Sequence, residues 1–223
     1  MKQILLMIAV VMGQTVLAAD KKPLTKEESA KVIEAAIRYE LKNPTGELTK
    51  ADYEKVTQLG LHRSHLTEIP KELEKLNQLK TLWLSDNQLT DVTGLEKLDQ
   101  LEELYLHYNQ LTDVKGLEKL TQLKELYLNN NKLTDVKGLE KLTKLKTLGL
   151  NNNQLTDVTG LEKLDQLEEL SLHYNKLTSV KGLEKLTQLK VLWLNSNPDL
   201  TKAQIDRLQK ALPKCEITSS PKK

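Results

Sequence analysis

The sequence predicts an elongated α/β solenoid with one parallel β-sheet. Three observations predict it: a 22-residue repeat, a fixed spacing of leucines inside each repeat, and helix-forming sequence at both ends. The clearest mark of the repeat is an asparagine at a constant step of 22 residues: Asn87, Asn109, Asn131, Asn153, Asn175 and Asn197. A less regular copy covers residues 56–78, where Ser64 takes the place of the asparagine. We therefore expect seven repeats over residues 56–197.

Most repeats read LxxLxLxxNxL followed by a GLEKL run, and this spacing predicts which side chains are buried. The LxL part alternates with period two, so we expect a short strand with its leucines inward and the intervening residues outward. Leucines at these intervals in a repeat of 20–29 residues are the signature of leucine-rich repeats. Because one repeat cannot bury its own leucines, stacked repeats must share one core. We expect a right-handed horseshoe or arc, with the sheet on the concave face and extended or 3₁₀ segments on the convex face.

The asparagine column has a structural explanation. Each asparagine lies where the chain leaves a strand and bends. There its amide can hydrogen-bond backbone groups of its own turn and of the adjacent turn, which have no partner in the sheet. We therefore expect a ladder of buried asparagines along the solenoid.

The sequence ahead of the repeats predicts a helical N-terminal cap over residues 20–55. Thr25 and Glu28 form a capping-box pattern, and apolar residues follow at helical spacing. A second pair, Thr49 and Asp52, predicts a short helix that leads into the first strand. Such a cap covers the leucines of the first repeat, as a solenoid requires for solubility.

The sequence after the repeats predicts a helix–strand cap over residues 198–218. Thr201 is placed to cap a helix, Pro213 ends it, and Cys215–Ile217 predicts a last short strand. Cys215 is the only cysteine, and we expect it to be buried, because free cysteine is among the most buried residue types. We expect residues 219–223 to form a loose tail.

Residues 1–18 have the pattern of a secretory signal peptide. Lys2 supplies the positive start, Ile4–Met12 is apolar, and small residues allow cleavage after Ala18 or Ala19. The apolar run is too short for a membrane anchor. We therefore expect an exported protein, secreted or periplasmic, with no membrane span after cleavage, and we expect it to be a monomer.

Composition and motifs argue against nucleic acid, metal and catalysis. The formal net charge is +2 with 29% charged residues, and this balance gives no basic surface for nucleic acid. His107 and His173 lie three predicted strands apart, roughly 14 Å, which is too far to share an ion. Glu103 and Glu125 would lie in an open groove with nothing to separate their pKa values, as an acid–base pair requires. We expect no catalytic residues, no cofactor and no metal.

Aromatic residues are concentrated at the outward positions of the predicted strands. Six of the eight Trp and Tyr residues lie there, where alternation points them away from the leucine core. Exposed Trp and Tyr dominate the energetics of protein interfaces. Glu103 and Glu125 flank the aromatic residues and indicate a partner with basic groups. The predicted partner-binding residues are Trp83, Tyr105, Tyr127, Trp193, Glu103, Glu125, His107, Tyr108, His173 and Tyr174.

Other interpretations of these aromatic residues stay open. Neighbouring rings can stack simply to cover the sheet. The sequence LDQLEEL-x-LHYN occurs at residues 98–109 and again at 164–175, so His173 and Tyr174 can be duplicates without a purpose of their own. Aromatic faces also suit sugar rings, and a structural role in the cell envelope needs no ligand at all.

The 22-residue repeat, the cap sequence LTKADYEKVTQLGL and the signal-peptide pattern together resemble bacterial leucine-rich-repeat proteins of the internalin kind. The resemblance covers about residues 25–218. It implies a protein-binding module that recognises its partner through the concave face of the sheet.

Overall fold

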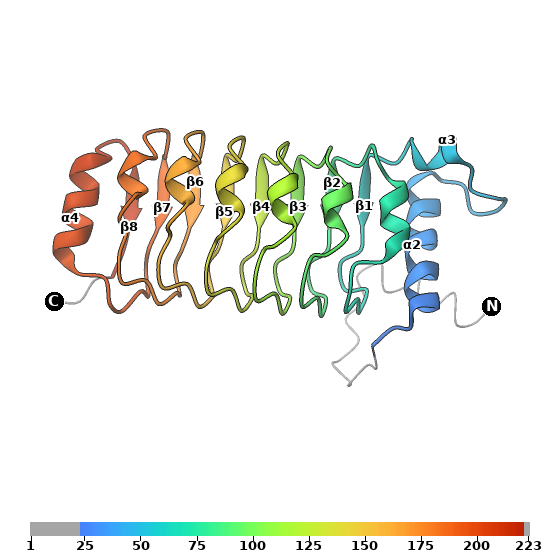
Figure 1. Cartoon of the computed structure of the whole chain (residues 1–223), viewed down its shortest axis with the longest axis horizontal. Coiled ribbons are helices and arrows are strands. Elements are labelled where there is room, and N and C mark those ends of the chain that lie inside the picture. Colours follow the sequence, from blue (N-terminus) through green and yellow to red (C-terminus); the bar gives the residue numbers. More distant parts are fainter. Residues whose placement is uncertain (1–22, 221–223) are drawn as a thin grey trace.

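The computed structural model describes residues 23–220, which form one elongated solenoid (Figure 1). Its sheet has eight parallel strands that follow each other in sequence order. The strands are β1 (Gln58–Gly60), β2 (Thr81–Trp83), β3 (Glu103–Tyr105), β4 (Glu125–Tyr127), β5 (Thr147–Gly149), β6 (Glu169–Ser171), β7 (Val191–Trp193) and β8 (Glu216–Thr218). The predicted fold class is confirmed: a leucine-rich-repeat solenoid with a parallel sheet and a helical N-terminal region.

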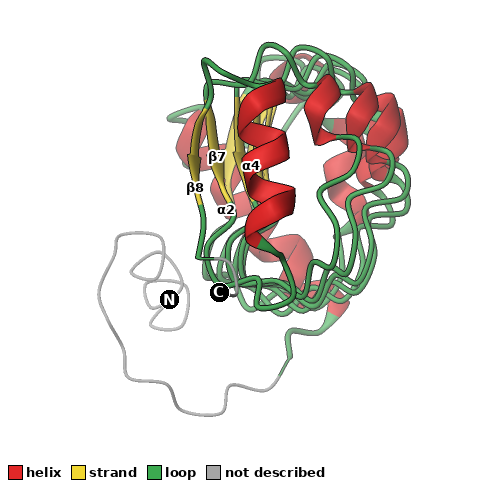
Figure 2. Ribbon diagram, turned by 90° about the vertical axis from the view of Figure 1, so that its left-hand side faces the viewer, coloured by secondary structure: helices red, strands yellow, loops and turns green. Residues whose placement is uncertain are grey.

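The opposite wall consists of short 3₁₀ helices, as the repeat length predicts (Figure 2). They are η1 (Lys71–Lys75), η2 (Leu95–Lys97), η3 (Leu117–Lys119), η4 (Leu139–Lys141), η5 (Leu161–Lys163) and η6 (Leu183–Lys185). A left-handed glycine starts η2 and each helix after it; Gly116, for example, has a φ of 100°. The Gly116 amide donates to Glu118 Oε2 at 2.6 Å, so the GLEKL run closes its own turn.

The core is one continuous cluster, mainly of leucines, that runs from one cap to the other. Leu104 of β3 pairs in register with Leu82 of β2 and Leu126 of β4, and all three are fully buried. The leucine that begins each LEK segment, such as Leu117, packs on the other side of the core and is also fully buried. The constant register fixes the outward residues, because each strand repeats the alignment of the one before it.

The asparagine ladder forms as predicted. Asn131 Oδ1 accepts the Leu111 amide at 3.0 Å, and its Nδ2 donates to the carbonyls of Leu106 and Leu128, also at 3.0 Å. At the first turn, where Ser64 replaces asparagine, Asn87 Oδ1 accepts the backbone amides of Ser64 and Leu66. The ladder therefore satisfies buried backbone groups that a bend would otherwise leave without partners.

Two helices precede the first repeat. α2 (Lys26–Glu40) starts at the predicted capping box of Thr25 and Glu28, and its residues Ile33 and Ile37 are buried. α3 (Lys50–Tyr53) starts at the second capping box and is only one turn long. Contacts between α2 and both β1 and η1 place the long helix over the open end of the core.

The last repeat is covered by α4 (Lys202–Ala211), which begins at the predicted cap residue Thr201. Strand β8 follows one residue later than the prediction and pairs in parallel with β7. Cys215 is 4% exposed, in agreement with the expectation that it is buried. Ser220 Oγ accepts the Ser196 amide at 2.8 Å, so the segment predicted as a loose tail is tied at its start.

The predicted signal peptide, residues 1–18, lies outside the described residues, as do residues 221–223. Within residues 23–220 no helix has the length and apolar character needed to cross a bilayer.

Candidate protein-binding surface

Three rings form a continuous stack on the outward face of the sheet. Trp83, Tyr105 and Tyr127 occupy the same position on β2, β3 and β4, and we call them the aromatic stack. The Trp83 and Tyr105 ring centroids lie 5.9 Å apart with planes at 21°, and those of Tyr105 and Tyr127 lie 4.9 Å apart at 10°. All three side chains are half-buried. The stack is therefore an ordered apolar ridge that lies apart from the leucine core.

Glutamates two residues earlier hold the hydroxyls of the two tyrosines. Tyr105 Oη donates to Glu103 Oε2 and Tyr127 Oη donates to Glu125 Oε2, each at 3.2 Å. Partial burial, together with these carboxylates, raises the pKa of Tyr127 to about 12 and raises the pKa of Tyr105 as well. Both hydroxyls therefore remain protonated donors at neutral pH, and each ring is fixed at its outer end.

Gly149 gives the last ring of the stack its place on the sheet. It occupies the next central position, on β5, and is buried. A Cβ at Gly149 would lie 3.2 Å from Tyr127 Cδ1 and 3.3 Å from Asn129 Oδ1. Because Gly149 has no side chain, the Tyr127 ring can pack close to the backbone of β5. Gly149 is not among the predicted site residues, although its position directly after three aromatic residues in the same column is a usable signal.

Trp193 is not part of the stack. It lies on β7, and the central positions of β5 and β6 between it and Tyr127 hold Gly149 and Ser171. Ser171 Oγ lies 2.9 Å from His173 Nδ1 and 3.3 Å from Asn151 Oδ1. The central positions of the sheet thus divide into an aromatic region over β2–β4 and a region without aromatic rings over β5 and β6, with Trp193 beyond it.

The predicted residues His107, Tyr108, His173 and Tyr174 lie beyond the ends of the strands and not on them. The strands end at Tyr105 and Ser171, so these four residues lie in the bends that follow. Tyr108 and Tyr174 both have a φ of 56°, in the left-handed region that a tyrosine adopts at a cost. They are 54% and 58% exposed.

Each of these tyrosines packs against the histidine before it. The ring centroids of His107 and Tyr108 lie 5.7 Å apart at 70°, and those of His173 and Tyr174 lie 5.6 Å apart at 68°. Burial lowers the pKa of both histidines, so both are mainly neutral near pH 7. Two identical His–Tyr pairs therefore project from one edge of the sheet.

A second set of glutamates, one residue before the strands, is paired with lysines. Glu102 lies between Lys80, at 3.1 Å, and Lys124. Glu168 lies in the same way between Lys146, at 3.6 Å, and Lys190. The hydrogen bonds from these lysines lower the pKa of both carboxyls. Both glutamates of this row are therefore neutralised, and the row carries more lysine than glutamate.

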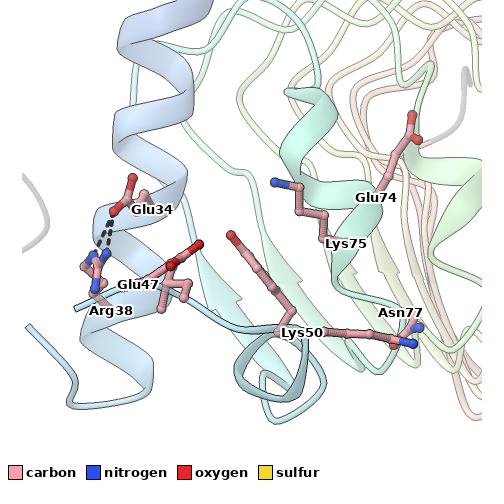
Figure 3. A pocket seen from close by; sticks show the side chains of 9 residues that line it. Glu34, Arg38, Glu47, Lys50, Glu74, Lys75 and Asn77 are labelled. Carbon is pink, nitrogen blue, oxygen red and sulfur yellow. Dashed lines mark hydrogen bonds and ion pairs between the residues drawn. The ribbon is translucent and has the colours of Figure 1, made fainter. Parts of the chain in front are cut away.

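A hollow of about 680 Å³ lies elsewhere, between α2 and η1 (Figure 3). Its lining alternates in charge, with Glu34, Arg38, Glu47 and Lys75 among its residues. The Arg38 guanidinium is held by Glu34 Oε1 and the Gly46 carbonyl, while its Nη1 is buried and unpaired. The mixed lining presents neither a dominant charge nor an apolar floor, and it does not indicate one ligand.

Residues 23–220 contain no group of three or more His, Cys, Asp or Glu side chains placed to hold a metal ion. The predicted His107 and His173 lie on separate turns, each against its own tyrosine.

Comparison with known families decides what kind of protein carries this surface. A family profile described as "Leucine Rich repeats (2 copies)" matches residues 99–139, 121–163 and 165–209, and one described as "Leucine rich repeat" matches residues 54–111. The chain belongs to the leucine-rich-repeat proteins. None of the curated proteins matches the chain by sequence.

Solved structures place this leucine-rich-repeat protein beside the internalins. An internalin (inlF) from Listeria monocytogenes is similar with a TM-score of 0.77 and 28% identity, over 91% of this chain and 60% of that one. An internalin C2 (inlC2) from the same species gives 0.52 and 27%, over 73% and 92%. A leucine-rich-repeat protein from Leptospira interrogans gives 0.60 and 31%, over 77% and 51%. The chain thus spans about 60% of the first of these structures, and the shared internalin-like architecture is that of a protein-interaction module.

Proposed function

We propose that this chain is an exported, non-enzymatic module that binds a protein partner through the concave face of its sheet, centred on the aromatic stack. The observation that carries the proposal is the stack itself, an ordered ridge of large rings outside the core. Rings that are already fixed lose little conformational freedom on binding, which favours their use as interface anchors. The internalin-like relatives support the same class of function.

The geometry of the stack favours a protein over a sugar. A sugar ring packs on an open aromatic face, but both faces of Tyr105 lie against its neighbours Trp83 and Tyr127. The hydroxyls of Tyr105 and Tyr127 are each bonded to a carboxylate beside the rings. An irregular apolar and polar protein surface fits that pattern better than a pyranose does.

The test is affinity capture with the mature chain, followed by measurement of affinity for the captured partner. The double variant Tyr105→Ala/Tyr127→Ala should weaken binding by about 2–4 kcal/mol if these rings are hot spots. The matched control Lys119→Ala/Lys141→Ala changes exposed residues at the ends of η3 and η4, on the opposite wall, and should leave affinity unchanged.

Equal affinity of the double variant would leave a structural role for the stack and would refute the binding proposal. Export is tested separately, by fractionation of cells that express the full chain and N-terminal sequencing of the product. Export predicts a processed product, outside the cytoplasm, that begins after Ala18 or Ala19.

A further inference from the structure

The outward face of the sheet has a one-sided charge. Three columns of residues form this face. They are the positions two residues before those of the aromatic stack, the positions of the stack itself, and the positions two residues after them. These columns hold Gln58, Thr81, Glu103, Glu125, Thr147, Glu169, Val191; Gly60, Trp83, Tyr105, Tyr127, Gly149, Ser171, Trp193; and His62, Ser85, His107, Asn129, Asn151, His173, Asn195. None of these residues is Lys or Arg, although the chain has 33 of them.

The glutamates on this face have no cationic partner within residues 23–220. Glu103 and Glu125 bond only to tyrosine hydroxyls, and no ion pair includes Glu103, Glu125 or Glu169. One residue earlier in the same turns, Glu102 and Glu168 are each held between two lysines. The repeats therefore supply lysines to neutralise one row of glutamates and leave the adjacent row negative.

This arrangement carries a repulsion that an incoming cation would relieve. Glu103 and Glu125 are register partners on adjacent strands, and like charges placed opposite each other destabilise a sheet. The nearby His107 and His173 do not offset the charge, because burial lowers the pKa of both. Glu169 lies two strands beyond Glu125, at a spacing of about 10 Å.

We propose that the partner's contact segment is basic: a stretch of protein that crosses the strands from β3 to β6 and carries at least two Lys or Arg side chains about 12 Å apart. One cation lies between Glu103 and Glu125 at the hydroxyl end of the stack, and the other meets Glu169. Apolar parts of the same segment contact the ring edges. The inference rests on the proposed function and adds the chemistry and direction of the partner.

The test uses a random peptide library displayed on phage and selected on the full chain. Selected peptides should be enriched in Lys and Arg, and the tightest of them should bind less well as salt rises, because these charges are partly exposed. The double variant Glu103→Gln/Glu125→Gln should bind the tightest peptide roughly tenfold or more weakly than the wild type does. The control Glu102→Gln/Glu168→Gln removes the same charge one residue away and should change affinity less than about twofold.

The outcomes separate this inference from the proposed function. Peptides that lose affinity with Tyr105→Ala/Tyr127→Ala but are not basic, and are unaffected by Glu103→Gln/Glu125→Gln, overturn the charge inference and leave the binding surface standing. Peptides that ignore both pairs of substitutions overturn both. A library that yields no binder counts against the basic segment.

Discussion

Residues 98–109 and 164–175 are the same sequence in two places, apart from Tyr105 in the first and Ser171 in the second. In the first copy the ring stacks between Trp83 and Tyr127, and its hydroxyl donates to Glu103. In the second copy Ser171 Oγ lies 2.9 Å from His173 Nδ1, and Glu169 is exposed. The outward residue at this position, together with its register partners on the adjacent strands, thus separates an apolar ridge from a polar surface.

The main features of the backbone beneath that residue are the same in both copies. Asn109 and Asn175 bond the carbonyls of equivalent turns at 3.0 Å, and Tyr108 and Tyr174 have the same φ of 56°. The two lysine-held glutamates, Glu102 and Glu168, also correspond. The comparison shows that the inward pattern determines the backbone, while the outward positions can vary the chemistry of the surface without disturbing it.

The largest stability effect is expected where the copies agree. Asn109→Ala and Asn175→Ala should each lower the free energy of unfolding by about 1–3 kcal/mol, because buried backbone groups lose their partners. Denaturant midpoints measure it. Equal losses confirm that the two scaffolds are equivalent, whereas an unchanged midpoint in either variant contradicts the ladder's role.

A smaller effect is expected where the copies differ. Tyr105→Ser converts the first copy into the second and should cost about 1–2 kcal/mol of stability, because two ring contacts are lost and each contributes about 0.5–1 kcal/mol on this half-exposed face. Ser171→Ala, at the equivalent position, should cost less than about 0.5 kcal/mol. If thermal melts gave both variants the same loss of stability, the ring contacts of the stack would not contribute measurably to stability.

A gain in stability is expected at the bends. Tyr108→Asn and Tyr174→Asn should each stabilise the chain by about 0.5–1 kcal/mol, since asparagine tolerates the left-handed region better than tyrosine. Asn130 and Asn152 already occupy the equivalent bends with φ of 57° and 55°, so Asn152→Tyr should produce the opposite change. Chemical denaturation of the three variants measures these changes. A loss of stability in Tyr174→Asn would show that the packing of the Tyr174 ring outweighs the backbone strain.

The smallest effect concerns pH. Burial lowers the pKa of His107 and His173 below the ordinary value of about 6.5, so unfolding takes up protons. Stability should therefore fall as the pH decreases through the unfolded-state pKa, and the contribution should be complete above it. Denaturant midpoints at pH 8 and pH 5, measured for the wild type and for His107→Gln/His173→Gln, isolate the contribution of the two histidines to the pH dependence of stability. An identical pH dependence in the double variant would contradict the assignment.

The sequence was sufficient for features that repeat. The asparagine column, the inward leucines and the capping boxes at Thr25, Thr49 and Thr201 predict the observed solenoid, because each follows from local spacing. The left-handed bends were missed, although Asp86, Asn130 and Asn152 at the same position carry the usual preference for that conformation.

Contacts between outward residues on different turns were harder to predict. Strand adjacency anticipates that Trp83, Tyr105 and Tyr127 lie in a row, but not that Tyr127 packs against Gly149. Nor does it separate Glu102, which is held by lysines, from Glu103, which is not. Those distinctions depend on side-chain direction, and a repeat pattern does not specify that.

The most direct test of the account is titration of the captured partner against Tyr105→Ser, the substitution that makes the two copies identical. We expect the binding free energy to weaken by about 2–4 kcal/mol, which lowers affinity roughly 30- to 1,000-fold, while the variant still unfolds in one cooperative transition. Wild-type affinity in that variant would contradict it, because the outward residue that distinguishes the copies would then have no part in binding.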